Sequence, residues 1–124
     1  MVNKHKIAKV LPYLITLAIL VLPAYAAENV TIDLIAKNIA YNTSTITVPA
    51  GANVTVNFHN EDQNVPHNFA VYDTSAAKKV IFKGDIITGP SETTYHFTAP
   101  DTPGTYFFRC DVHPTIMTGQ FIVK

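Results

Sequence analysis

After residue 27 the chain alternates apolar and polar residues with a period of two, and this alternation constrains the fold more than any other feature. The clearest segments are 30–34, 54–58, 93–98, 105–110 and 120–124, with weaker ones at 68–73 and 79–82. Successive side chains of a strand point to opposite faces, so such segments are typical of half-buried strands. Turn-forming Pro and Gly residues separate them about every 8–12 residues. The pattern predicts an all-β domain, a Greek-key antiparallel sandwich or barrel of about seven or eight strands. Segment 73–79 fits either a helical turn or a polar loop.

The first 26 residues have a different composition from the rest of the chain. Lys4, Lys6 and Lys9 precede an apolar run over 10–22, which is followed by Pro23-Ala-Tyr-Ala26. A basic start, an apolar segment and an A-x-A site are typical of a secretory signal peptide. We therefore predict a signal peptide over 1–26 and one domain over 27–124, exported to the periplasm, the extracellular space or the cell surface. If it is not cleaved, the uncharged run over 10–27 reaches the lower length limit of a membrane anchor.

Charge narrows the range of partners. The whole chain has 9 basic and 9 acidic residues and a formal net charge of zero. Three of the basic residues lie in the predicted signal peptide, so the domain over 27–124 carries a formal charge of about −3. Nucleic-acid binding requires clustered Lys and Arg residues, so we expect no nucleic-acid partner.

The chain has one cysteine, Cys110, so it cannot form an intrachain disulfide. An exported domain with a single thiol is expected to bury or occupy it. Cys110 ends a predicted strand and is followed within eight residues by His113 and Met117, with Pro114 interrupting regular strand pairing. This places a thiolate, an imidazole and a thioether close together, and the soft thiolate and thioether favour copper over hard cations.

Three histidines of the domain could supply a further ligand. His67 follows a polar loop at the start of a predicted strand, where a side chain can lie over the end of a sandwich. His59 and His96 lie in alternating strands, out of phase with the neighbouring aromatic residues, which predicts that they face solvent.

The sequence resembles the cupredoxins, the small blue-copper proteins of the plastocyanin, amicyanin and pseudoazurin type. The resemblance covers most of the domain, and its most specific part is the C-terminal motif. The matching segments are Val48-Pro-Ala-Gly51, Val54–Phe58, Pro66-His67-Asn68, Pro103–Pro114 and Met117-Thr-Gly119.

The resemblance implies one mononuclear Cu(I)/Cu(II) centre. His67, Cys110 and His113 would be its equatorial ligands and Met117 a weak axial one, while Asn68 would tie the two ligand loops together. One spacing departs from the family. Here His113 and Met117 are spaced as H-x3-M, whereas plastocyanin-like members have H-x4-M and amicyanin-like members have H-x2-M. The colour and potential of the site therefore stay open.

The resemblance also implies the function, a one-electron carrier between transient redox partners, and no enzymatic activity. Electrons would leave through the solvent edge of His113. The residues expected to frame this edge as a docking surface are Pro114, Thr115 and Ile116, and those expected to form a dry apolar surround are Phe69, Phe108 and Ile116.

Three other functions stay open at this stage. A red-copper relative would have an open coordination position, with His59 or Glu61 near the His67 loop in sequence. A copper-trafficking protein usually has an exposed site rich in Met or His, and this domain has one methionine. A cysteine hydrolase would use Cys110 as a nucleophile, but no substrate site is recognisable. Multicopper enzymes need more histidine ligands than the four in residues 27–124.

Overall fold

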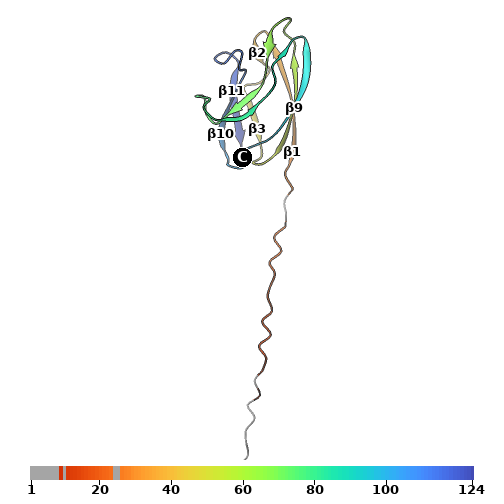
Figure 1. Cartoon of the computed structure of the whole chain (residues 1–124), viewed down its shortest axis with the longest axis vertical. Helices are drawn as coiled ribbons and strands as arrows, with labels where there is room; N and C mark the ends of the chain where they lie inside the picture. Colours follow the sequence, from red (N-terminus) through yellow and green to blue (C-terminus); the bar gives the residue numbers. More distant parts are fainter. Residues whose placement is uncertain (1–8, 10, 24–25) are drawn as a thin grey trace, which may run out of the picture.

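The computed structural model describes residues 9, 11–23 and 26–124. Residues 11–23 and 26–28 form neither helix nor strand and are drawn below the domain in Figure 1. Among the residues described, no helix has the length and apolar character needed to cross a membrane. Most of the basic start of the predicted signal peptide, and residues 24–25 of its cleavage motif, lie outside the described residues. The division at residue 26 stays a prediction.

The domain is a sandwich of two sheets, which confirms the all-β prediction and decides between sandwich and barrel (Figure 1). The first sheet has the order β2 (Ala40–Tyr41), β1 (Asn29–Lys37), β4 (Asn53–Asn60) and β9 (Ser91–Thr98). The second has the order β3 (Thr45–Val48), β11 (Thr118–Val123), β10 (Gly104–Arg109), β6 (Ala70–Tyr72) and β7 (Val80–Lys83). A short pair joins β5 (Pro66–His67) to β8 (Ile87–Thr88).

Two strand pairs are parallel, so the expected antiparallel arrangement was wrong for these two pairs. β1 pairs with β4 in parallel, and β3 pairs with β11 in parallel. The reason is the path of the chain between the sheets. After β1 and β2 the chain crosses to the second sheet as β3 and then returns as β4, which runs beside β1 in the same direction.

The period-two pattern produces the core. In β4, Val54, Val56 and Phe58 are buried, while the residues between them are partly exposed. Full burial of one such side chain contributes about 1.5–3 kcal/mol. An aromatic cluster fills the space between the sheets, and the ring centroids of Phe69 and Phe108 are 5.5 Å apart. Phe69 and Phe108 lie within two positions of His67 and Cys110 in the chain. The aromatic core therefore adjoins the end of the sandwich at which His67 and Cys110 lie.

Two local features differ from or refine the sequence prediction. Strand β3 was not predicted, although its residues alternate between exposed and buried. Segment 73–79 contains turns and no helix, and the Asp73 carboxylate accepts backbone N–H bonds from Thr74 and Lys79. The loop reading of this segment is therefore correct.

Candidate metal centre

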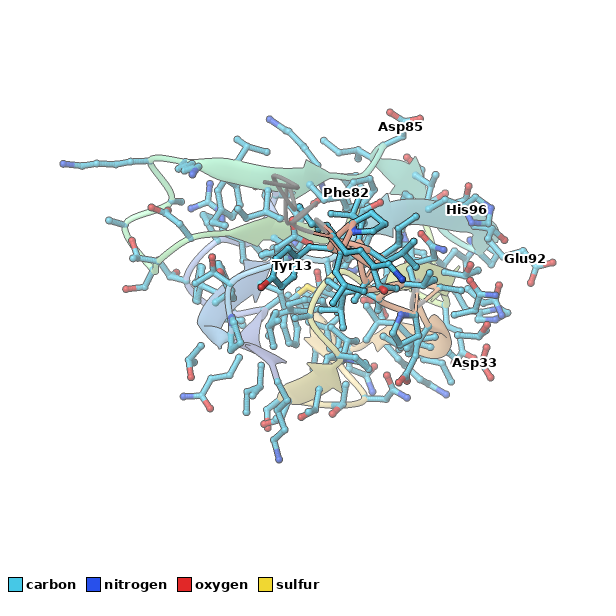
Figure 2. All side chains as sticks on the ribbon, turned by 90° about the horizontal axis from the view of Figure 1, so that it is seen from below. Tyr13, Asp33, Phe82, Asp85, Glu92 and His96 are labelled. Atoms are coloured by element: carbon cyan, nitrogen blue, oxygen red, sulfur yellow. The ribbon has the colours of Figure 1, made fainter. Side chains whose placement is uncertain are left out.

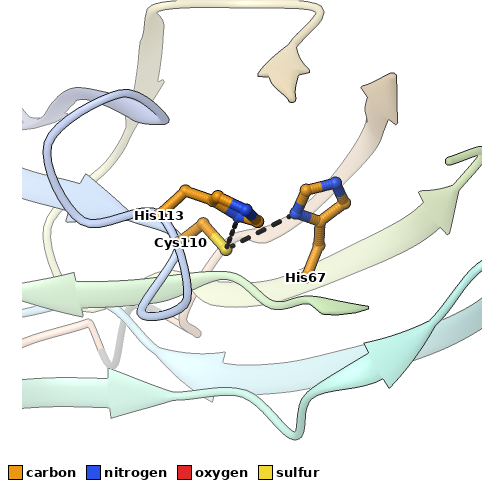
Figure 3. Close-up of side chains that lie close together, drawn as sticks. All are labelled: His67, Cys110 and His113. Atoms are coloured by element: carbon orange, nitrogen blue, oxygen red, sulfur yellow. Dashed lines mark hydrogen bonds between the residues drawn. The ribbon is translucent and has the colours of Figure 1, made fainter. Parts of the chain in front are cut away.

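Three donor side chains meet at one end of the sandwich (Figure 3). The Sγ atom of Cys110 lies 3.7 Å from Nδ1 of His67 and 3.8 Å from Nδ1 of His113. All three donor atoms lie within 4.8 Å of one another. His67 and Cys110 have no exposed surface, whereas His113 is half-buried. The cluster is thus closed toward the core and reaches solvent through His113.

The loop after β10 places two of these donors and returns Met117 to the same region. The N–H of His113 donates to the carbonyl of Cys110 (3.2 Å), and the N–H of Met117 donates to the carbonyl of His113 (3.1 Å). The N–H of Cys110 then donates to the carbonyl of Met117 (2.9 Å), which closes the loop. Met117 is 1% exposed and belongs to the core cluster together with Cys110.

Asn68 joins the two ligand loops, as expected. Its Oδ1 accepts the backbone N–H of Asp111 (2.7 Å), and its Nδ2 donates to Oδ2 of Asp111 (2.8 Å) and to the carbonyl of Gly84 (2.9 Å). Asn68 is fully buried. Its amide therefore fixes the distance between the segment of His67 and the segment of Cys110.

Asp111 is the centre of a charged network beside Cys110. Its Oδ1 accepts bonds from the Tyr72 hydroxyl (2.6 Å) and from Nε of Arg109 (3.1 Å), and the Arg109 guanidinium lies over the Tyr72 ring. Partial burial raises the pKa of Asp111, but the hydrogen bonds from Tyr72, Asn68 and Arg109 outweigh it and hold this pKa below its ordinary value. The carboxylate is therefore ionised at neutral pH.

The outward-facing histidines were predicted correctly. His59 bonds to Glu92 across the β4–β9 pair (3.0 Å), and His96 contacts the Thr55 hydroxyl. Figure 2 shows His96 and Glu92 at the periphery of the domain. Glu61 forms an ion pair with Lys37 (3.6 Å).

The apolar surround was predicted correctly for two of three residues. Phe69 and Phe108 are fully buried. Ile116 is 69% exposed, so its assignment to a dry surround was wrong. It lies in the loop between His113 and Met117, where Pro114 and Thr115 are also exposed.

Sequence reasoning missed the acidic partners of the site. Asp62 lies 2.8 Å from Nε2 of His67, and Asp111 organises the network beside Cys110. Asp111 follows the cysteine directly, which was a usable signal. Asp62 lies in a polar loop of ordinary turn composition, and its role depends on the path of that loop in space.

The comparisons with known proteins agree with this geometry. The sequence matches the cupredoxin-like domain family over residues 10–123. The chain belongs to this family. A search of curated proteins finds no match.

Among solved structures, this cupredoxin is similar to two auracyanins. It is 25% identical to auracyanin A of Chloroflexus aurantiacus, which is described as a "blue" copper protein, with a TM-score of 0.69 over 77% of this chain and 99% of the other. It is 27% identical to auracyanin of Roseiflexus castenholzii, with a TM-score of 0.69 over 80% and 99%. Amicyanin of Paracoccus versutus is 26% identical, with a TM-score of 0.53 over 76% and 81%.

The donor spacing of this cupredoxin fits a small trigonal metal site. A metal ion about 2.3 Å from a thiolate and about 2.0 Å from an imidazole nitrogen separates the two donors by roughly 3.7 Å in a trigonal arrangement. The observed separations are 3.7 and 3.8 Å. Two imidazoles, a thiolate and a thioether form the donor set of type 1 copper. The cofactor of the domain is one copper ion.

Proposed function

We propose that this protein carries single electrons between redox partners through a type 1 copper centre held by His67, Cys110, His113 and Met117. The observation that carries the proposal is the convergence of His67 Nδ1, His113 Nδ1 and Cys110 Sγ at one end of the sandwich. Copper, when bound, supplies the one-electron couple between Cu(I) and Cu(II).

Hydrogen bonds and packing within the protein hold the donor residues in place. Cys110 and Met117 are linked by a backbone hydrogen bond, and Asn68 bonds to Asp111 across the two ligand segments. Phe69 and Phe108, each two positions from a proposed ligand in the chain, are fully buried aromatic residues. Such packing resists displacement of the ligands. A site that keeps its geometry in both oxidation states suits electron transfer.

The exposed residues around His113 are the proposed docking surface for a redox partner. Pro114, Thr115 and Ile116 are exposed beside the half-buried imidazole, and Ile116 presents an apolar side chain to solvent. Transient redox encounters bury small areas, with charge complementarity at the rim. We also propose export of the domain, which rests on the signal-like composition of residues 1–26.

The alternative copper functions receive less support. His59 and Glu61 are engaged with Glu92 and Lys37, so neither faces the donor cluster as an additional ligand of an open red-copper site. Met117 is buried in the core, whereas trafficking sites expose their soft ligands. A closed mixed-ligand site favours electron transfer over copper delivery.

The visible spectrum of the Cu(II)-loaded protein tests the proposal. We expect an intense blue band from thiolate-to-copper charge transfer, which is reversibly lost on one-electron reduction. A dominant band at shorter wavelength would instead indicate a red site. Absence of any thiolate-to-copper band would contradict the assignment of Cys110.

A further inference from the structure

Asp62 makes a direct contact with the buried imidazole of His67. Its Oδ2 lies 2.8 Å from Nε2 of His67, the ring nitrogen other than the one near Cys110. The His67 side chain has no exposed surface, and the Asp62 side chain is only 11% exposed. The contact is therefore shielded from water, which strengthens it relative to a surface pair.

The contact determines which nitrogen of His67 carries the proton. A carboxylate can only accept hydrogen bonds, so Nε2 must be the protonated nitrogen of the neutral imidazole. Nδ1 then keeps its lone pair, and this lone pair is on the side of the ring facing Cys110 Sγ. Carboxylate partners of this kind orient a ligating imidazole and increase its basicity.

Asp62 is itself fixed by a second part of the chain. Its Oδ1 accepts the N–H of Asn38 (2.6 Å), and its Oδ2 also accepts the N–H of Ile39 (2.9 Å). Asn38 and Ile39 form the turn between β1 and β2 with φ of 54° and 55°. Positive φ is costly for a β-branched residue such as Ile39, so the turn requires compensating contacts. Asp62 supplies them, which links the turn to His67.

From these contacts we propose that Asp62 is a positioning residue that fixes His67 for copper and lowers the reduction potential of the centre. The proposal rests on the proposed type 1 copper function. An anionic group near the metal favours Cu(II) over Cu(I), because the ion with the higher charge gains more from it. Asp62 also has an orienting effect, because its hydrogen bond holds the ring of His67 in one orientation.

The test compares Asp62→Asn with Glu61→Gln. The amide keeps the shape of the carboxylate, removes its charge and leaves one acceptor atom for three N–H donors. Glu61→Gln removes a neighbouring negative charge that contacts Lys37 and does not contact His67. The two variants thus have the same formal charge but differ in the contact with the imidazole.

The measurements are the reduction potential and the separate affinities for Cu(II) and Cu(I). For Asp62→Asn we expect a roughly 10–100-fold loss of Cu(II) affinity and a smaller loss of Cu(I) affinity. Each tenfold loss of Cu(II) affinity relative to Cu(I) affinity raises the reduction potential by about 59 mV for one electron. We expect Glu61→Gln to shift the potential much less. Equal shifts in the two variants, or equal losses of both affinities, would overturn the proposal.

A measurement on the wild-type protein covers the case in which Asp62→Asn does not fold. In the copper-free protein, where no metal holds Nδ1, ¹⁵N NMR of the His67 ring should show a slowly exchanging proton on Nε2, which faces Asp62. A proton on Nδ1, or rapid exchange at Nε2, would contradict the role of Asp62. If the wild-type protein gives no thiolate-to-copper band, the proposed function fails first, so the two failures are distinguishable.

Discussion

Asn68 and Asp111 are joined by two hydrogen bonds, and each of them directly follows a proposed copper ligand. The Asn68 amide accepts the Asp111 N–H at 2.7 Å and donates to the Asp111 carboxylate at 2.8 Å. These bonds connect residues 43 positions apart in the chain. The relative position of His67 and Cys110 therefore depends on one buried side-chain amide as well as on the strand pairing.

Replacing Asn68 should destabilise the protein and loosen the metal centre. Asn68→Ala removes three hydrogen bonds and leaves partner groups of Asp111 and Gly84 without their bonds. Each unsatisfied buried group costs about 1–3 kcal/mol. We expect the free energy of unfolding to fall by about 3 kcal/mol or more in urea denaturation, with a broadened charge-transfer band.

The matched control for this change is Asn57→Ala. Asn57 donates one exposed side-chain bond to Asp33 (2.9 Å), accepts a long one from the Thr94 hydroxyl (3.5 Å) and lies on β4, which carries none of the proposed ligands. We expect a loss below about 1 kcal/mol. Similar losses in the two alanine variants would refute the special role of the Asn68 bonds.

Substitution of the two sulfur donors should separate their roles. Cys110→Ser replaces the thiolate by a harder hydroxyl oxygen, so we expect the charge-transfer band to disappear. Met117→Gln changes only the weak axial donor, so we expect the colour to remain and the potential to change. Visible spectra and voltammetry of the two variants check this. Persistence of the band in the serine variant would rule out Cys110 as its source.

The sequence predicted the parts of the fold and site that depend on local pattern. Alternation in β4 and β9 identified half-buried strands, and the Cys110-x2-His113 spacing identified the donor loop. The parallel pairing of β1 with β4 was missed, because the path of the chain between sheets leaves no local signal. Ile116 was misassigned for a related reason, since apolar character does not show whether a loop residue points inward.

The role of Asp62 at the site could not be predicted from local sequence either. A loop aspartate five residues before His67 has many possible orientations, and ordinary turn chemistry accounts for it in the sequence. Its contact with the imidazole arises because the turn at Asn38 and Ile39, from another part of the chain, holds both carboxylate oxygens. Only the assembled sandwich brings these segments together.

Gly119 allows a test of packing beneath the centre. A Cβ atom at Gly119 would lie 2.2 Å from Cζ of Phe108 and 2.6 Å from the carbonyl of Ser44. Because Phe108 is fully buried, it cannot move aside without disturbing the core. We expect Gly119→Ala to lower the free energy of unfolding by about 1–3 kcal/mol or more.

The control for this packing test is Gly104→Ala. Its added Cβ would meet only Tyr106, at an ordinary contact distance of 3.8 Å. We expect almost no change in stability, measured by thermal or urea denaturation of both variants. If Gly119→Ala is as stable as Gly104→Ala, the packing around Phe108 is looser than the structure indicates.

Tyr41 should make stability depend on pH in the alkaline range. Its hydroxyl donates to the carbonyl of Asn68, and burial, followed by the nearby Cys110, raises the pKa of Tyr41 well above its ordinary value of 10.0. The unfolded chain loses this proton near its ordinary pKa, while the folded protein keeps it. The contribution of protonated Tyr41 to the free energy of unfolding is therefore complete below about pH 10. It is lost as the pH rises toward the pKa of Tyr41 in the folded protein, and the free energy of unfolding then falls by at most about 1.4 kcal/mol per pH unit.

The phenylalanine variants at two tyrosines isolate this effect. Tyr41→Phe should lower stability at neutral pH by about 1 kcal/mol through loss of the bond to Asn68. It should also make the fall in stability above pH 10 less steep, because the residue no longer ionises in the unfolded chain. Tyr106→Phe removes an exposed hydroxyl bond to Thr102 (2.8 Å) and should retain the wild-type slope. Urea denaturation between about pH 8 and 11.5 measures both slopes, and equal slopes would show that burial of Tyr41 does not control alkaline unfolding.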